Sequence, residues 1–149
     1  MVQFNTLMML FLAAFVTVAI LRRLLTALNI RHLRLHGHEV PEAFTGEIDG
    51  ETLSRMSRYT AESSKFGAME GLFDDLGTLA ILLSGFLPWL TARILPWKEH
   101  FIASGLMFFG VLFLISFLLG IPFALYQTFV IEKKYGFSTV TPALWISDL

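Results

Sequence analysis

Cysteine is absent from the 149 residues, which excludes disulfides and thiolate metal sites. The net charge of −1 offers no basic excess for nucleic acid, and we find no base-reading motif. Also missing are the Gly-x-Ser-x-Gly turn of serine hydrolases and the Gly-Lys-Ser/Thr phosphate loop. Nucleic acid is therefore not an expected partner, and no complete catalytic motif is recognisable.

Apolar residues are abundant instead, at 55% of the chain with 15 phenylalanines and a mean hydropathy of +0.66. They come in long blocks, the first of which covers residues 4–21 without a charge. At about 1.5 Å per residue this block is about 27 Å long as a helix, which approaches the thickness of a hydrocarbon core. Arg22 and Arg23 follow the block rather than precede it, which favours a retained anchor over a cleaved signal peptide.

Two further blocks cover residues 76–95, interrupted by Pro88, and residues 101–131. Helices are expected because an open sheet cannot satisfy its backbone groups in lipid, and three spans cannot close a barrel. The sequence thus predicts an all-α polytopic membrane protein with three transmembrane helices and, in its first loop, a cytoplasmic amphipathic helix.

The third block carries no charge before Glu132 and is about 46 Å long as one straight helix, more than a bilayer core requires. We expect Pro122 to kink this helix and the turns near Tyr126 and Phe129 to leave the membrane.

Basic residues near the ends of the spans predict the orientation. They are more numerous after the first and third blocks than in the connection between the second and third. The N-terminus is therefore expected outside, with the loop 22–71 and the C-terminal segment in the cytoplasm. The residues counted are Arg22, Arg23, Arg31, Arg34, Lys133 and Lys134 against Arg93 and Lys98.

Within the loop 22–71, Asp49 is a candidate N-cap for an amphipathic helix that begins near Gly50. Such a helix would lie on the membrane surface or dock on a soluble domain. Gly67 and Gly71 share one helical face, either for close approach of another backbone or as a hinge before the second span.

Two groups of residues are weak candidates for chemistry. His32 and His36 are spaced to share a metal, with His38 nearby, but the neighbouring arginines disfavour a cation. Asp74 and Asp75 stand at the start of the second span, near a helix N-terminus, where a structural interface is favoured over a proton pathway.

The strongest signal is the string that follows the third block. It reads Glu132-Lys133-Lys134-Tyr135-Gly136-Phe137-Ser138-Thr139-Val140-Thr141, then Trp145 and Asp148, after Pro122 and Tyr126. It resembles the pattern after the third helix of membrane-embedded zinc metallopeptidases of the CAAX prenyl protease 1 type. The first loop is similar too, at His38-Glu39-Val40-Pro41, Phe44, Tyr59-Thr60 and Lys65-Phe66-Gly67.

The resemblance implies an endopeptidase that binds zinc through His-Glu-x-x-His in a later catalytic domain, and that cuts membrane-delivered or prenylated proteins. This sequence carries no such motif, so no catalytic or zinc-binding residue is expected in it. What the resemblance implies for this sequence is structural: a cytoplasmic turn near the catalytic domain. The residues that match this turn are Glu132, Tyr135, Gly136, Phe137 and Thr141.

Local chemistry agrees with a turn. Gly136 suits the left-handed position that ends a helix, while Thr141 and Pro142 suit the N-cap and first position of a further helix over 141–149. The first hypothesis is the N-terminal membrane domain of such a peptidase, residing in a bacterial inner membrane. The alternatives are a non-enzymatic membrane adaptor that keeps only the fold, and a metal sensor using the histidines.

Overall fold

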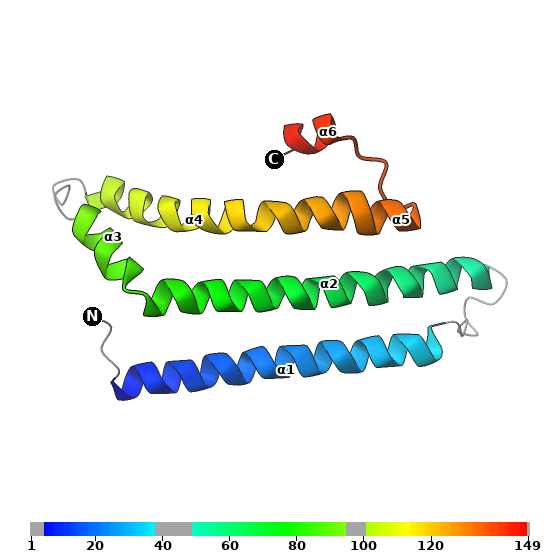
Figure 1. Ribbon diagram of the computed structural model, residues 1–149, viewed down its shortest axis with the longest axis horizontal. Coiled ribbons are helices and arrows are strands. Elements are labelled where there is room, and N and C mark those ends of the chain that lie inside the picture. The colour runs from blue at the N-terminus through cyan, green and yellow to red at the C-terminus, as the bar shows by residue number, and fades with distance from the viewer. Residues whose placement is uncertain (1–4, 38–48, 95–100, 149) are drawn as a thin grey trace.

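The computed structural model describes residues 5–37, 49–94 and 101–148, and the regular structure in these ranges is helical. Three long helices lie side by side, with α2 between α1 and α4 (Figure 1). A short helix, α6, folds back beside α4 near the C-terminus (Figure 1). The elements are α1 Thr6–His36, α2 Gly50–Leu83, α3 Phe86–Ile94, α4 Phe101–Tyr126, the π-helical segment Gln127–Glu132, α5 Lys133–Tyr135 and α6 Pro142–Ser147.

Helix α1 extends well beyond the first apolar block. It starts at the N-cap Asn5, whose side chain accepts the N–H of Met8 at 2.9 Å, and it ends at the C-cap Gly37. Residues 22–36 are therefore helix rather than part of an extended loop. They contain neither glycine nor proline, so nothing in the chain breaks the helix where the apolar block ends.

Helix α2 begins where the sequence predicts, with Asp49 as the N-cap residue, and continues unbroken to Leu83. The amphipathic helix and the first part of the second span are thus one element, and a hinge at Gly67 or Gly71 is wrong. Asp74 and Asp75 also lie deep within this helix. Their expected place near a helix N-terminus is wrong, because α2 starts at Gly50.

The second apolar block is broken at Gly85, whose φ of 80° is a left-handed conformation that glycine adopts without strain. The two helices on either side, α2 and α3, are bent by 60°. Pro88 lies in the first turn of α3, where its missing N–H has no helical partner to lose. The interruption assigned to Pro88 therefore comes from Gly85.

The third apolar block forms one long helical run that passes through Pro122, adopts π-helical geometry from Gln127 to Glu132 and ends at Tyr135. This run and α1 are each long and apolar enough to cross a membrane. The bent pair of α2 and α3 gives a third span if it is counted as one.

Few side chains in the described ranges are buried: only Leu90, Ile94 and Ile131. Large apolar side chains on the long helices stay exposed, for example Ile102 at 77% and Phe113 at 70%. Water would not tolerate continuous apolar faces of this extent, whereas lipid covers them at no cost.

Candidate functional site

The predicted turn meets α2 through an ionic cluster. The carboxylate of Glu62 on α2 accepts hydrogen bonds from the Lys134 ammonium at 2.7 Å and the Tyr135 hydroxyl at 2.6 Å. We call Tyr59, Glu62, Lys134, Tyr135 and Phe137 the junction. It fixes the end of the third long helix to a point in the first half of α2.

Aromatic rings surround this cluster. Tyr59 contacts the ring of Tyr135 edge-on at 5.7 Å between centroids and the ring of Phe137 at 4.7 Å. The guanidinium of Arg55 lies 5.9 Å from the centre of the Phe137 ring, within cation–π range. Two of the five turn residues predicted from the resemblance, Tyr135 and Phe137, therefore pack directly on α2.

The charges of the junction stabilise one another. Glu62 lies outside the apolar block 76–95, and hydrogen bonds from Lys134 and Tyr135 hold the pKa of its carboxyl below the ordinary value of 4.5. The same contact with Glu62 raises the pKa of Tyr135. The carboxylate is therefore ionised and the phenol protonated at neutral pH.

The turn itself has the predicted geometry. Gly136 has a φ of 76°, and the N–H groups of Gly136 and Phe137 donate to the carbonyls of Lys133 at 3.2 Å and Glu132 at 2.9 Å. This pairing is the Schellman motif, which closes a helix C-terminus. Glu132 thus contributes its carbonyl to the turn, and its side chain is half-buried.

Helix α6 starts as predicted. The Thr141 hydroxyl accepts the N–H of Leu144 at 3.3 Å, with Pro142 as the first helical residue. Trp145 then lies edge-on to Phe129, with 6.4 Å between ring centroids. The chain therefore turns back after Gly136 and runs beside the π-helical segment.

Next to the junction, α2 packs on α4 and on the π-helical segment through polar and aromatic contacts. The Gln127 amide donates to the Ser63 hydroxyl at 3.0 Å, and Phe66 stacks on Tyr126 at 4.7 Å. Tyr126 therefore lies beside the polar half of α2. A cavity of about 570 Å³ opens here, lined by Glu62, Lys65, Phe66, Met69, Pro122, Phe123, Tyr126 and Ile131.

On the other face of α2, Asp75 pairs with α1. Its carboxylate lies 2.8 Å from Nη1 of Arg23 and 3.9 Å from Nη1 of Arg22. Asp74 lines a different cavity, of about 280 Å³, between α2 and α4 together with Glu70 and Ser116. The structural role expected for the aspartate pair thus has a direct counterpart at Asp75.

Glu62 is not among the candidate residues that the sequence predicted. A signal was present, because Tyr59, Glu62 and Phe66 are spaced at three and four residues and so share one face. All three contact the third helix or the turn that follows it.

Comparison with known proteins decides the family. Residues 29–149 match the family model described as CAAX prenyl protease N-terminal, five membrane helices. This chain belongs to the CAAX prenyl protease N-terminal family. It is an integral membrane protein and carries that family's N-terminal membrane domain.

The CAAX prenyl protease 1 of Saccharomyces cerevisiae is 29% identical over 129 residues, covering 80% of this chain and 28% of the relative. The CAAX prenyl protease 1 homolog of Homo sapiens is 33% identical over 116 residues, covering 73% and 24%. The chain thus spans about a quarter of the length of these relatives.

The crystal structure of S. mikatae Ste24p superposes with a TM-score of 0.76 at 26% identity, covering 91% of this chain and 32% of that protein. The fold described above is therefore that of a CAAX prenyl protease N-terminal region. The family description has five membrane helices, whereas the described ranges of this chain supply two, or three with the bent pair.

The CAAX prenyl protease resemblance also implies zinc, and the described residues do not fit it. No group of three or more metal-ligating side chains occurs within residues 5–37, 49–94 and 101–148. His32 and His36 stack at 4.6 Å between ring centroids, while His38 and Glu39 lie outside the described residues. We therefore assign no metal chemistry to the part of the chain that is described.

Proposed function

We propose that this chain anchors a zinc metalloendopeptidase in the membrane and forms part of its chamber wall and substrate path. One observation supports this most directly. Glu62 binds Tyr135, a residue of the turn that the family pattern identifies, and its neighbour Lys134, so α2 sets the direction in which the chain continues toward a catalytic domain. The catalytic half itself would come from sequence outside these residues.

The contribution of this chain would be positional. The Schellman motif at Gly136 ends the long helical run that begins with α4, and the junction holds that end against α2. A catalytic domain attached beyond α6 would therefore be oriented relative to the membrane by packing in this chain. Precise orientation of reacting groups is worth several kcal/mol in catalysis, so a loose junction would lower the rate.

The proposed substrate is a protein or peptide delivered from the membrane, such as one with a prenylated C-terminus. The named relatives are CAAX prenyl proteases, and this part of the proposal rests on them. Within the chain, the cavity of about 570 Å³ beside Phe66, Phe123 and Tyr126 combines aromatic walls with the polar groups Glu62 and Lys65. It suits the passage of a chain with both apolar and polar parts.

We propose the orientation that the basic residues predict, with the N-terminus outside and the first loop in the cytoplasm. The chain lacks cysteine, so single-cysteine variants at Thr6 and Ser147 can be labelled with a membrane-impermeant maleimide without background. Labelling of Thr6→Cys from outside and protection of Ser147→Cys in intact cells is expected. The reverse pattern would overturn this orientation.

The membrane is a separate part of the proposal. A bacterial inner membrane is the expected location, whereas the relatives compared above come from yeast and human. Membrane fractionation of the native host, with antibody detection of this chain, tests the assignment directly.

The deciding experiment measures cleavage of a prenylated reporter peptide, together with bound zinc. The chain is compared with a version extended by the coding sequence that follows it in its genome. Activity and about one zinc per molecule in the extended form alone are expected. Absence of both from the extended form, with normal folding, would favour the membrane adaptor. Stoichiometric zinc on these 149 residues would instead favour the histidine-based sensor.

A further inference from the structure

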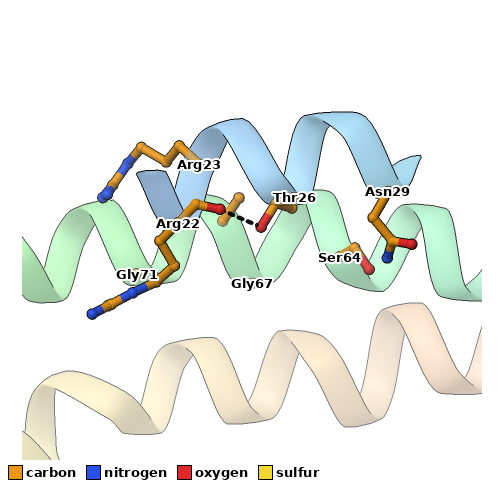
Figure 2. Close-up of a pocket in the computed structure, with 8 residues that line it drawn as sticks. Arg22, Arg23, Thr26, Asn29, Ser64, Gly67 and Gly71 are labelled. Carbon is orange, nitrogen blue, oxygen red and sulfur yellow. Dashed lines mark hydrogen bonds between the residues drawn. The ribbon is translucent and has the colours of Figure 1, made fainter. Parts of the chain in front are cut away.

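A groove of about 190 Å³ lies between α1 and α2. From α1 it is lined by Arg22, Arg23, Thr26 and Asn29. From α2 it is lined by the small residues Ser64, Gly67, Ala68 and Gly71. Figure 2 shows Arg22 extending across α2 beside Gly71, and Asn29 standing over Ser64.

The small residues keep this groove open rather than bring the helices together. A Cβ atom added at Gly67 or Gly71 would meet nothing within 4 Å. The expectation that these glycines permit close backbone approach is therefore wrong. The space they leave faces the longest polar side chains of α1 and is available to a ligand.

The groove carries an excess of positive charge. The two guanidinium groups of Arg22 and Arg23 lie near a single carboxylate, that of Asp75. The carboxylate is 2.8 Å from Arg23 and 3.9 Å from Arg22, so Arg23 is its closer partner. One positive charge is left over, and Arg22 carries it on a side chain that is 64% exposed. Arg23 is already engaged, because its Nη1 donates to the Ala19 carbonyl at 2.8 Å and pairs with Asp75 at 2.8 Å.

The position of the groove limits what can fill it. Arg22 directly follows the charge-free block of α1, so it lies where a spanning helix passes the lipid headgroups. Leu21, Leu24 and Leu25 are each more than half exposed beside it and offer an apolar surface for acyl chains. A phosphate attached to a lipid meets both conditions, whereas free phosphate meets only the first.

We propose that this groove binds the headgroup phosphate of an anionic phospholipid. Arg22 supplies the ion pair, and Asn29 and Ser64 offer hydrogen bonds to the glycerol side. The site is independent of any peptidase activity, because it uses none of the junction residues. It would hold α1 and α2 together at the membrane surface.

The test is native mass spectrometry of the full chain in detergent, titrated with phosphatidylglycerol or phosphatidylcholine. The unmodified protein is expected to retain phosphatidylglycerol preferentially. Arg22→Gln should weaken that binding by about tenfold, as loss of one charge-assisted contact implies. Arg31→Gln removes another exposed charge from the same helix outside the groove and should leave binding unchanged. Equal loss in both variants would reduce the effect to net charge and overturn the site.

A steric variant tests the same groove without changing its charge. Gly67→Leu places a side chain in the open space and should weaken phosphatidylglycerol binding as Arg22→Gln does. Gly110→Leu on α4 also meets open space at its Cβ and should have no effect. If Gly67→Leu fails to fold by circular dichroism, the comparison of Arg22→Gln with Arg31→Gln decides alone. If inorganic phosphate displaces the lipid at equal concentration, the groove recognises the phosphate group alone. That result would overturn the lipid assignment.

Discussion

Tyr135 donates its hydroxyl to Glu62 at 2.6 Å, although 73 positions of sequence separate the two residues. The bond joins the turn that follows α4 and the π-helical segment to α2, and Lys134 binds both oxygens of the same carboxylate, sharing Oε2 with Tyr135. One carboxylate therefore holds Tyr135 of the turn and its neighbour Lys134, which makes the junction easy to test by single substitutions.

Loss of the Tyr135 hydroxyl should loosen the turn. Tyr135→Phe keeps the ring against Tyr59 and removes only the hydrogen bond to Glu62, at an expected cost of about 1 kcal/mol in a partly exposed site. For a chain of this size that lowers the melting temperature in detergent by about 2–4 °C. Tyr126→Phe, which keeps its stack on Phe66, is the matched control and should melt unchanged. An equal shift in both variants would contradict the assignment to the hydroxyl.

The pH dependence of the junction has a definite sign. The pKa of Glu62 is lower in the folded chain than its ordinary 4.5, so its contribution to stability is fully present above pH 4.5. That contribution is lost as the pH falls through the folded pKa. Glu62→Gln should therefore melt below the parent protein at pH 7, with the gap closing as the pH drops below 4.5. A gap that stays constant from pH 7 to pH 3 would show that ionisation of Glu62 is not its source.

The pair of Arg23 and Asp75 should matter more. Asp75 is 15% exposed, and removing one partner of a mostly buried pair leaves the other charge uncompensated, at an expected cost of about 2 kcal/mol for Asp75→Asn. Adding Arg23→Met should recover much of this loss, because the orphaned charge is then removed as well. Asp74→Asn is the control, since Asp74 lines the cavity on a different face of α2 beside Glu70. Chemical unfolding in detergent measures all three, and equal losses at both aspartates would refute the pairing.

The long helical run that begins with α4 depends on Gly136 for its end. Gly136→Ala forces a side chain into a φ of 76° and should cost about 1 kcal/mol. Gly77→Ala replaces a glycine inside α2 where a Cβ meets open space, so it should be neutral or stabilising by up to about 1 kcal/mol. Opposite signs in thermal melts are the expected result. The same sign at both positions would mean that Gly136 is not held in the left-handed conformation.

The sequence predicted the features that depend on neighbours along the chain. The N-cap at Thr141 and the left-handed Gly136 follow from local backbone chemistry, and the structure confirms both. Asp49 occupies the N-cap position of α2 as predicted, but its side chain makes no capping hydrogen bond. The three apolar blocks were likewise visible in composition. Their helices, however, run on past the blocks at both α1 and α2, since loss of apolarity does not end a helix.

What the sequence did not predict depends on contacts between distant elements. Asp74 and Asp75 are chemically identical neighbours, yet about 100° of helical rotation sends them to different faces of α2. Asp75 meets α1, and Asp74 faces α4. Glu62 was not predicted for the same reason. Its contacts with Lys134 and Tyr135, which are more than 70 positions away in the sequence, distinguish it from a solvated carboxylate.

The last prediction concerns the proposed role in the peptidase. In the extended enzyme, Glu62→Gln should lower kcat for a prenylated reporter peptide several-fold while bound zinc stays constant. The reason is that Glu62 touches no expected catalytic group and acts only by orienting the turn that precedes the catalytic domain. Glu51→Gln, an exposed change in the first turn of the same helix, should leave kcat unchanged. A fall in zinc content parallel to activity would point to unfolding, whereas unchanged kcat with a weakened junction would remove the turn from the positioning of the catalytic domain.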